Sequence, residues 1–207
     1  SSPLRYIQAK SPRSHVQYID GKDNAAAAKL AKESSLAIVF VNQWMSEGRD
    51  APTLSLPNNQ DALVNAVAAA NPNTIVVLET GGPVTMPWAD HVKGIVEMWY
   101  PGIGGAQALA NILFGDVNPS GKLPVTFAKS DDQLPHPVVP GMDVKHGGKT
   151  VGDDQHHEVR PFDLKYTAGA AVGYKWFEST HRQPLFPFGF GLSYTTFGYS
   201  GLKVDDA

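Results

Sequence analysis

The sequence contains no cysteine in its 207 residues. Disulfide bonds, thiolate catalysis and zinc-thiolate sites are therefore excluded within it. An excess of charge is also missing, because 17 basic residues are balanced by 20 acidic ones, which leaves a net charge of −3. This balance gives no reason to expect nucleic acid as a partner.

Long hydrophobic runs are the third feature that the sequence lacks. Runs such as LAIVFV (36–41) and TIVVL (74–78) are far shorter than the ~20 residues that a membrane helix needs. We therefore expect no membrane as a partner, and no basic-then-apolar leader opens the sequence. The composition, 42% hydrophobic and 18% charged, is typical of a globular protein with one large or two small domains.

Apolar strands and amphipathic helices alternate over the first 127 residues. The expected helices are 20–34, with Asp20 and Asp23 as candidate N-caps, then 58–71 and 104–115. The expected strands are 36–41, 74–80, 94–100 and 122–127. Because these strands are hydrophobic throughout, the pattern predicts a mainly parallel sheet with both faces covered.

The sequence changes character after Phe127. Residues 130–161 are rich in proline, histidine and acidic side chains and show no sustained periodicity, which predicts a long surface loop. Two later segments, 171–178 and 192–204, are rich in aromatic and β-branched residues and are expected to be strands.

The stretch NQWMSEGRDAP (42–52) is the strongest candidate for a functional site. Ligands of parallel α/β sheets bind just beyond the carboxyl ends of the strands, and Glu47 follows the first expected strand. Trp44 and Met45 beside it could partly desolvate the carboxylate, which would raise its pKa toward that of a general acid. The alternative is an ordinary solvated Glu47 that pairs with Arg49.

Two other motifs are weaker candidates. The glycines of YPGIGGAQALA (100–110) lead into a helix as in a dinucleotide site, but Gln107 stands where the third glycine should be. The cluster DDQHHE (153–158) offers metal ligands without a helical His pair, so a surface loop is the better interpretation. We therefore expect neither a cofactor nor a bound metal.

Four motifs in order, SEGRD, YPGIGGAQALANILFGDVNPSGKLPVTF, VGYKWFE and PLFPFGFGLSYTTFGYSGL, resemble the second domain of glycoside hydrolase family 3. The resemblance implies an α/β three-layer sandwich with a mainly parallel sheet over residues 1–190, with the loop excursion at 130–161. Residues 191–207 would begin a fibronectin-III-like module. It also implies an upstream first strand and a (β/α)8 barrel domain, without which the sandwich is incomplete.

The resemblance further implies a retaining exo-acting β-glycosidase, in the first place a β-glucosidase. In that family the barrel supplies an aspartate nucleophile and a loop of the second domain supplies the acid/base, whose position Glu47 matches. Arg49 stands where many members have an aromatic residue that contacts the leaving sugar. We therefore expect either Arg49 or Trp44 to bind the substrate there, an oligosaccharide or aryl β-glycoside.

These implications carry two expectations about the chain itself. It should require no cofactor, and it should be inactive alone, needing an N-terminal barrel fragment as its partner. A secreted or periplasmic location fits the polysaccharide substrates of the family.

Three alternative functions stay open at this point. The first is a β-xylosidase or arabinofuranosidase of the same family, and the second is a non-catalytic carbohydrate-binding module. The third, a flavodoxin-like nucleotide-binding domain, is weakened by the glycine spacing.

Overall fold

The computed structural model describes residues 2–47, 51–139 and 165–204. Its centre is a parallel sheet in which β2 (Thr74–Thr80) lies between β1 (Ala37–Gln43) and β3 (Gly94–Glu97). The register pairs Ala37 with Thr74 and Gln43 with Thr80, so β1 and β2 end side by side. Leu78 pairs with Glu97, which places the end of β3 at the same edge of the sheet.

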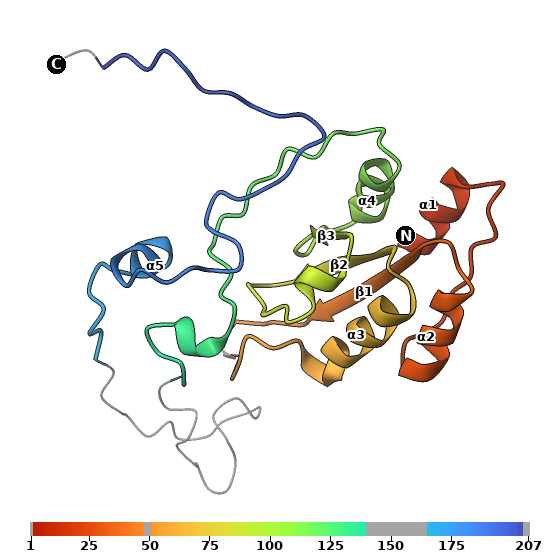
Figure 1. Ribbon diagram of the computed structural model, residues 1–207, viewed down its shortest axis with the longest axis horizontal. Helices are drawn as coiled ribbons and strands as arrows, with labels where there is room; N and C mark the ends of the chain where they lie inside the picture. The colour runs from red at the N-terminus through yellow and green to blue at the C-terminus, as the bar shows by residue number, and fades with distance from the viewer. Residues whose placement is uncertain (1, 48–50, 140–164, 205–207) are drawn as a thin grey trace, which may run out of the picture.

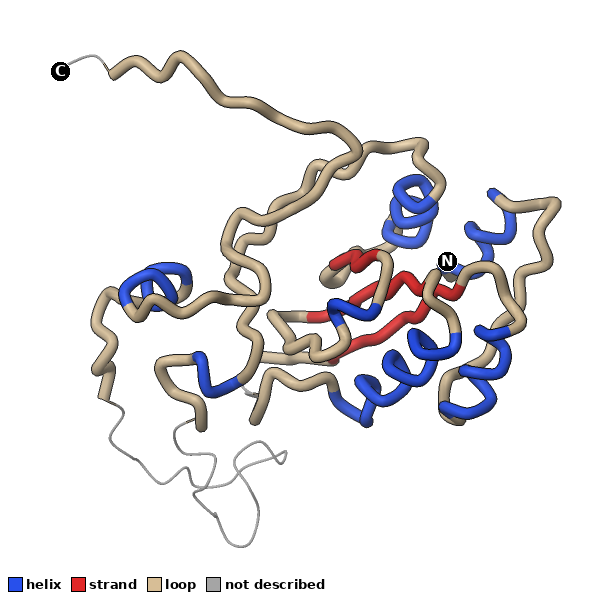
Figure 2. The backbone as a smooth tube through the Cα atoms, in the orientation of Figure 1, coloured by secondary structure: helices blue, strands red, loops and turns tan. Residues whose placement is uncertain are grey.

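Helices cover both faces of this sheet, as Figures 1 and 2 show. The helices are α1 (Pro3–Lys10), α2 (Asn24–Lys32), α3 (Gln60–Ala70), α4 (Gly105–Leu113) and α5 (Tyr174–Ser179), with 3-10 turns at Pro57–Asn59, Ala89–His91 and Asp131–Gln133. Helices α2 and α3 pack together on one side, whereas α1 and α4 pack together on the other. The expected three-layer α/β sandwich with a parallel sheet is confirmed.

Local chemistry explains where the helices begin. The Asp23 side chain accepts hydrogen bonds from the backbone N–H groups of Ala25 and Ala26, at 2.9 and 3.1 Å, and so caps α2. Helix α1 has proline at its first position and Lys10 in its last turn. These signals were present in the sequence, although no helix was expected within residues 1–19.

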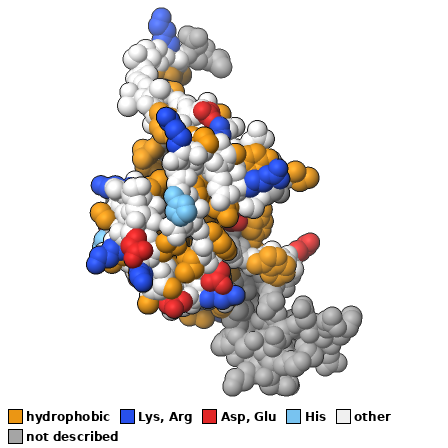
Figure 3. Space-filling model, turned by 90° about the vertical axis from the view of Figure 1, so that its right-hand side faces the viewer, with side chains coloured by type: hydrophobic (Ala, Val, Ile, Leu, Met, Phe, Trp, Pro, Cys, Tyr) orange, Lys and Arg blue, Asp and Glu red, His pale blue; other side chains and the backbone are white. Residues whose placement is uncertain are grey.

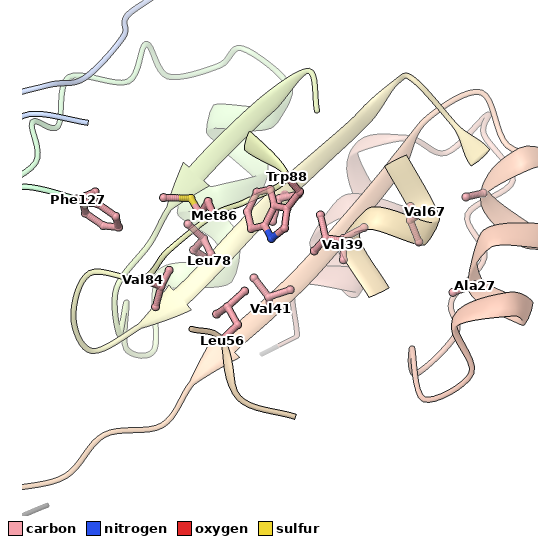
Figure 4. Close-up of a cluster of buried hydrophobic side chains, with 13 residues drawn as sticks. Ala27, Val39, Val41, Leu56, Val67, Leu78, Val84, Met86, Trp88 and Phe127 are labelled. Atoms are coloured by element: carbon pink, nitrogen blue, oxygen red, sulfur yellow. The ribbon is translucent and has the colours of Figure 1, made fainter. Parts of the chain in front are cut away.

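The main hydrophobic core lies between the sheet and helices α2 and α3 (Figure 4). Its largest member is Trp88, which is fully buried and donates its indole N–H to Asp61 at 2.7 Å. Burial raises the pKa of the Asp61 carboxyl, and the bond from Trp88 opposes that rise. Apolar side chains from β1, from β2 and from the segment after β2 belong to the same cluster as the indole (Figure 4): Val39, Val41, Leu78, Val84 and Met86.

The surface shows the near balance of acidic and basic residues that the sequence has (Figure 3). Acidic, basic and apolar side chains are interspersed on the face that Figure 3 presents. Within the described residues, no helix is both long and apolar enough to cross a membrane.

The expected strand at 94–100 is shorter in the structure, and that at 122–127 is not part of the sheet. The chain leaves β3 after Glu97, because Trp99 adopts a positive φ of 54°. Residues 122–127 instead run antiparallel to 185–190 and form a single bridge, between Phe127 and Phe186. A longer ladder is prevented because Pro124 and Pro187 have no N–H to donate.

The two late strands were also predicted wrongly. Residues 174–179 form the helix α5, which starts after Gly173 at a positive φ of 56°. Its aromatic residues serve packing: Phe177 is buried, and the Trp176 indole donates to the carbonyl of Gln133. Residues 192–204 form no strand, and their apolar side chains are largely exposed.

Only part of the expected loop excursion can be compared with the structure. Residues 130–139 contain the short turn Asp131–Gln133 and otherwise lack helix and strand. The DDQHHE cluster lies outside the described residues.

Asn71, which ends α3, is bonded to the end of α2, and its replacement tests this link. Its buried amide donates to the carbonyls of Ala31 and Ser34 at 2.9 and 2.8 Å, and its oxygen accepts from the Asn73 N–H. We expect Asn71→Ala to lower the free energy of unfolding by about 2–3 kcal/mol, since the Ser34 carbonyl loses its donor, the Asn73 N–H loses its acceptor, and the Ala31 carbonyl keeps only its bond from the Ser34 N–H. Urea unfolding monitored by circular dichroism measures the change.

The matched control for this prediction is Asn73→Ala. The Asn73 side chain is exposed and donates one bond, to the Ser35 carbonyl at 3.2 Å. It should cost less than about 1 kcal/mol. Equal losses in the two variants would contradict the role assigned to Asn71.

Candidate active site at the carboxyl ends of the strands

The backbone leaving β1 is held from its outer side by Gln60. The Gln60 side chain accepts from the Asn42 N–H at 2.9 Å and donates to the Asn42 carbonyl at 2.7 Å, as a neighbouring strand would. Asn58 and Asn59, both with positive φ, precede Gln60 and lead into α3. Pairing with β2 on the other side extends β1 to Gln43, two residues beyond the strand end expected from the sequence.

Tyr100 holds the same backbone from the inner side. Its hydroxyl accepts from the Met45 N–H at 2.8 Å and donates to the Gln43 carbonyl. Gly81 makes room for this contact, because a Cβ there would lie 2.9 Å from the Tyr100 hydroxyl and 3.0 Å from the Met45 Cβ. The ends of all three strands therefore meet around one phenol.

The candidate acid Glu47 lies four residues past Gln43 in the chain and is exposed. Trp44 is 73% exposed, and Met45 is also exposed. The expected partial desolvation of Glu47 by these neighbours is therefore not found in the described residues, because neither side chain buries it. Arg49, the other candidate for substrate binding, lies outside the described residues.

An open depression of about 340 Å³ adjoins this segment. It is lined by residues from the ends of β1 and β2 and from the turn after β3: Asn42, Gln43, Trp44, Glu79, Tyr100, Pro101 and Gly102. Trp44 and Tyr100 contribute aromatic surface, while Asn42 and Glu79 contribute polar groups. Such a combination suits a polar ligand that also has apolar faces, as sugars do.

Glu97 is a feature of this edge that the sequence reasoning missed. It accepts hydrogen bonds from the Thr80 hydroxyl at 3.1 Å and from the Trp99 N–H at 2.7 Å. Burial raises its pKa to about 7, against the opposing effect of these bonds. The available signal was a lone carboxylate in the apolar stretch GIVEMWY.

The glycine-rich stretch before α4 has a packing explanation. A Cβ on Gly105 would come within 2.4 Å of the Pro101 side chain, so only glycine allows this turn. Gly102 has a positive φ of 65°. Within the described residues, no group of three His, Asp or Glu side chains could hold a metal ion.

The fold and the position of the site define an α/β domain that presents polar and aromatic side chains at the carboxyl ends of parallel strands. Residues 1–194 match the glycosyl hydrolase family 3 C-terminal domain. The chain therefore belongs to that family, which confirms the resemblance seen in the sequence.

Curated relatives agree with this family. A beta-glucosidase of Rhizobium radiobacter is 40% identical over 191 residues, covering 87% of this chain and 21% of the relative. Beta-glucosidase B of Emericella nidulans is 44% identical over 187 residues, covering 86% of this chain and 21% of the relative. The chain thus spans about a fifth of the length of these relatives.

Solved structures show the same fold. DesR, a beta-glucosidase from Streptomyces venezuelae in complex with D-glucose, matches with a TM-score of 0.71 and 45% identity, over 84% of this chain and 20% of that one. The beta-D-glucoside glucohydrolase of Trichoderma reesei matches with a TM-score of 0.81 and 30% identity, over 97% of this chain and 27% of that one.

Glu97 should make stability depend on pH. Its folded pKa of about 7 lies above the ordinary value of 4.5, so the folded state binds the proton more tightly. The resulting stabilisation is complete below pH 4.5 and is lost as the pH rises through about 7. Glu97→Gln stays neutral, so it should be more stable than the parent protein at pH 8 and nearly equal to it at pH 5.

Urea unfolding at both pH values measures this effect, with Glu178→Gln as the control at an exposed carboxylate. The control should leave the difference between pH 5 and pH 8 unchanged. An unaltered pH dependence in Glu97→Gln would contradict the assignment.

Proposed function

We propose that this chain supplies the general acid/base, Glu47, of a retaining exo-acting β-glucosidase that hydrolyses terminal nonreducing β-D-glucosyl residues. The observation that carries the proposal is the position of Glu47 in a domain of this family: it is exposed just beyond the anchored end of β1. The names of the relatives, all beta-glucosidases among those given above, support glucose as the sugar.

In the first step of the reaction, Glu47 carries a proton. An aspartate of the barrel attacks the anomeric carbon, the bond from that carbon to the leaving oxygen breaks, and Glu47 donates its proton to that oxygen. In the second step, the Glu47 carboxylate takes a proton from water. The water oxygen attacks the anomeric carbon, and the bond to the aspartate breaks.

A barrel partner fits the surface around the site. Ile103, in the turn before α4, is 96% exposed. Trp44 and Tyr100, which line the depression, are each more than half exposed. Exposed apolar groups of this kind mark a contact surface. The leaving sugar is proposed to be bound either by Trp44, which would stack on it, or by Arg49, which would bind its hydroxyls.

Replacing Glu47 in the enzyme that contains this chain tests its role. Glu47→Ala removes the proton donor but leaves the nucleophile, so a dinitrophenyl glucoside should still form the glycosyl-enzyme. A disaccharide with a poor leaving group should react at least about 100-fold more slowly. Azide, which needs no general base, should accelerate turnover of the activated substrate and yield a β-glucosyl azide.

Glu178→Ala, at an exposed glutamate on α5, is the control and should change neither rate. Near-parental hydrolysis of the disaccharide by Glu47→Ala would refute the proposal. Comparing aryl glucoside with aryl xyloside turnover decides between the β-glucosidase and the β-xylosidase alternative.

The chain by itself should hydrolyse no aryl glucoside, because an acid without nucleophile and sugar-binding pocket lacks both covalent chemistry and positioning. Adding a barrel fragment of the same enzyme should restore turnover. Release of nitrophenol measures it. With a substrate that has a poor leaving group, a chain carrying Glu47→Ala should restore far less turnover than the parent chain. Activity of the purified chain alone would overturn this prediction.

A further inference from the structure

We infer that Tyr100 and Asp131 are positioning residues that fix the backbone on the two sides of Glu47, an inference that rests on the proposed function. Tyr100 binds the chain before Glu47, and Asp131 binds the chain after it. Neither side chain needs to contact the sugar for this role. Each acts through the backbone that carries the acid.

On the first side, Tyr100 fixes the backbone on both sides of Trp44 with one hydroxyl. The phenol accepts from the Met45 N–H at 2.8 Å and donates to the Gln43 carbonyl. Its position depends on the turn at Trp99, where φ is 54°. Met45 also packs against the turn after β2, since its sulfur would lie 3.1 Å from a Cβ on Gly81.

On the second side, Asp131 fixes the chain before it enters the core. One carboxylate oxygen accepts from the Leu54 N–H at 2.9 Å, and the other accepts from the Thr53 hydroxyl. The Leu54 carbonyl in turn accepts from the Thr85 N–H at 2.8 Å. Leu56, two residues further on, is buried in the core.

The chain before and after Glu47 is therefore tied to the segments that follow β3 and β2. Tyr100 comes from the segment after β3, and Thr85 from the segment after β2. Asp131 comes from a third segment, which is far away in the sequence. A general acid must stay within about 0.5 Å of its productive position, and a misplacement of about 1 Å can cost roughly 100-fold in rate.

Tyr100→Phe isolates the first anchor, because it removes one oxygen and keeps the ring. The matched control is Tyr194→Phe, in which the lost hydroxyl donates to the Ile112 carbonyl at 2.6 Å, in the last turn of α4. In the enzyme that contains this chain, Tyr100→Phe should lower kcat/KM for a glucose disaccharide about tenfold. The kcat/KM for a dinitrophenyl glucoside, which reports only the formation of the glycosyl-enzyme, should stay within about twofold, since this leaving group needs no acid.

A purely structural role of Tyr100 would slow both substrates equally, and that result would overturn the inference. So would no effect on either substrate. Tyr194→Phe should leave the ratio of the two rates unchanged. Circular dichroism and the thermal midpoint show whether each variant is folded before its rates are compared.

Asp131 provides a second, independent variant. Asp131→Ala loses both bonds and should show the same dependence on the leaving group as Tyr100→Phe. Asp131→Asn can still accept from Leu54 and donate to the Thr53 hydroxyl, so it should restore most of the disaccharide rate. Asp132→Ala is the control, because that side chain accepts from Ser130 and not from the chain after Glu47.

The inference and the proposed function can fail separately. If Glu47→Ala shows no dependence on the leaving group, the proposed function is wrong and the inference falls with it. If Glu47→Ala shows that dependence but Tyr100→Phe and Asp131→Ala do not, Glu47 is the acid and the two anchors do not position it.

Discussion

The parallel pairing of β1 with β2 is the constraint on which the candidate site depends. Seven residue pairs in register, from Ala37–Thr74 to Gln43–Thr80, make the two strands end together. The residues that line the depression come from the ends of β1 and β2 at this edge and from the turn that follows β3. A shift of one residue would exchange the faces of β1, turning Val39 and Val41 out of the core, so burial fixes the register and thereby the start of the Glu47 segment.

The sequence was sufficient for the parts of the fold that rest on short-range patterns. β2 was predicted with its observed bounds, 74–80, because a continuous apolar run between an Asn-Pro-Asn turn and a Gly-Gly pair leaves little choice. The helices 58–71 and 104–115 were predicted to within a few residues at each end. The predicted role of Glu47 as the acid/base came from the family resemblance. Its residue type and its position after a strand did not by themselves distinguish a catalytic acid from a solvated loop carboxylate.

The rest depends on partners that are distant in the sequence. Trp176 suits a strand by propensity, but its indole donates to the carbonyl of Gln133, 43 residues earlier in the sequence. Tyr100 and Asp131 reach backbone atoms 55 and 77 residues away in the sequence. No local pattern encodes such bonds. Glu97 was visible as an odd residue in an apolar strand, yet its burial under the turn at Trp99 follows only from the folded chain.

Most departures from local backbone preference in the described residues lie at one edge of the sheet, with His181, after α5, as the exception among the residues other than glycine that have positive φ. Trp99, Asn58 and Asn59 adopt positive φ, and Glu97 is held with a raised pKa, all within segments that join or support the strand ends. Each departure costs free energy, of the order of 1 kcal/mol or more for a strained backbone. At the opposite, amino-terminal end of the sheet, the buried Asn71 binds the carbonyl of Ala31 in the last turn of α2 and that of Ser34 just after the helix. Proteins tolerate such departures where function requires a specific geometry, so their concentration beside Gln43 and Tyr100 favours this edge as the working end of the domain.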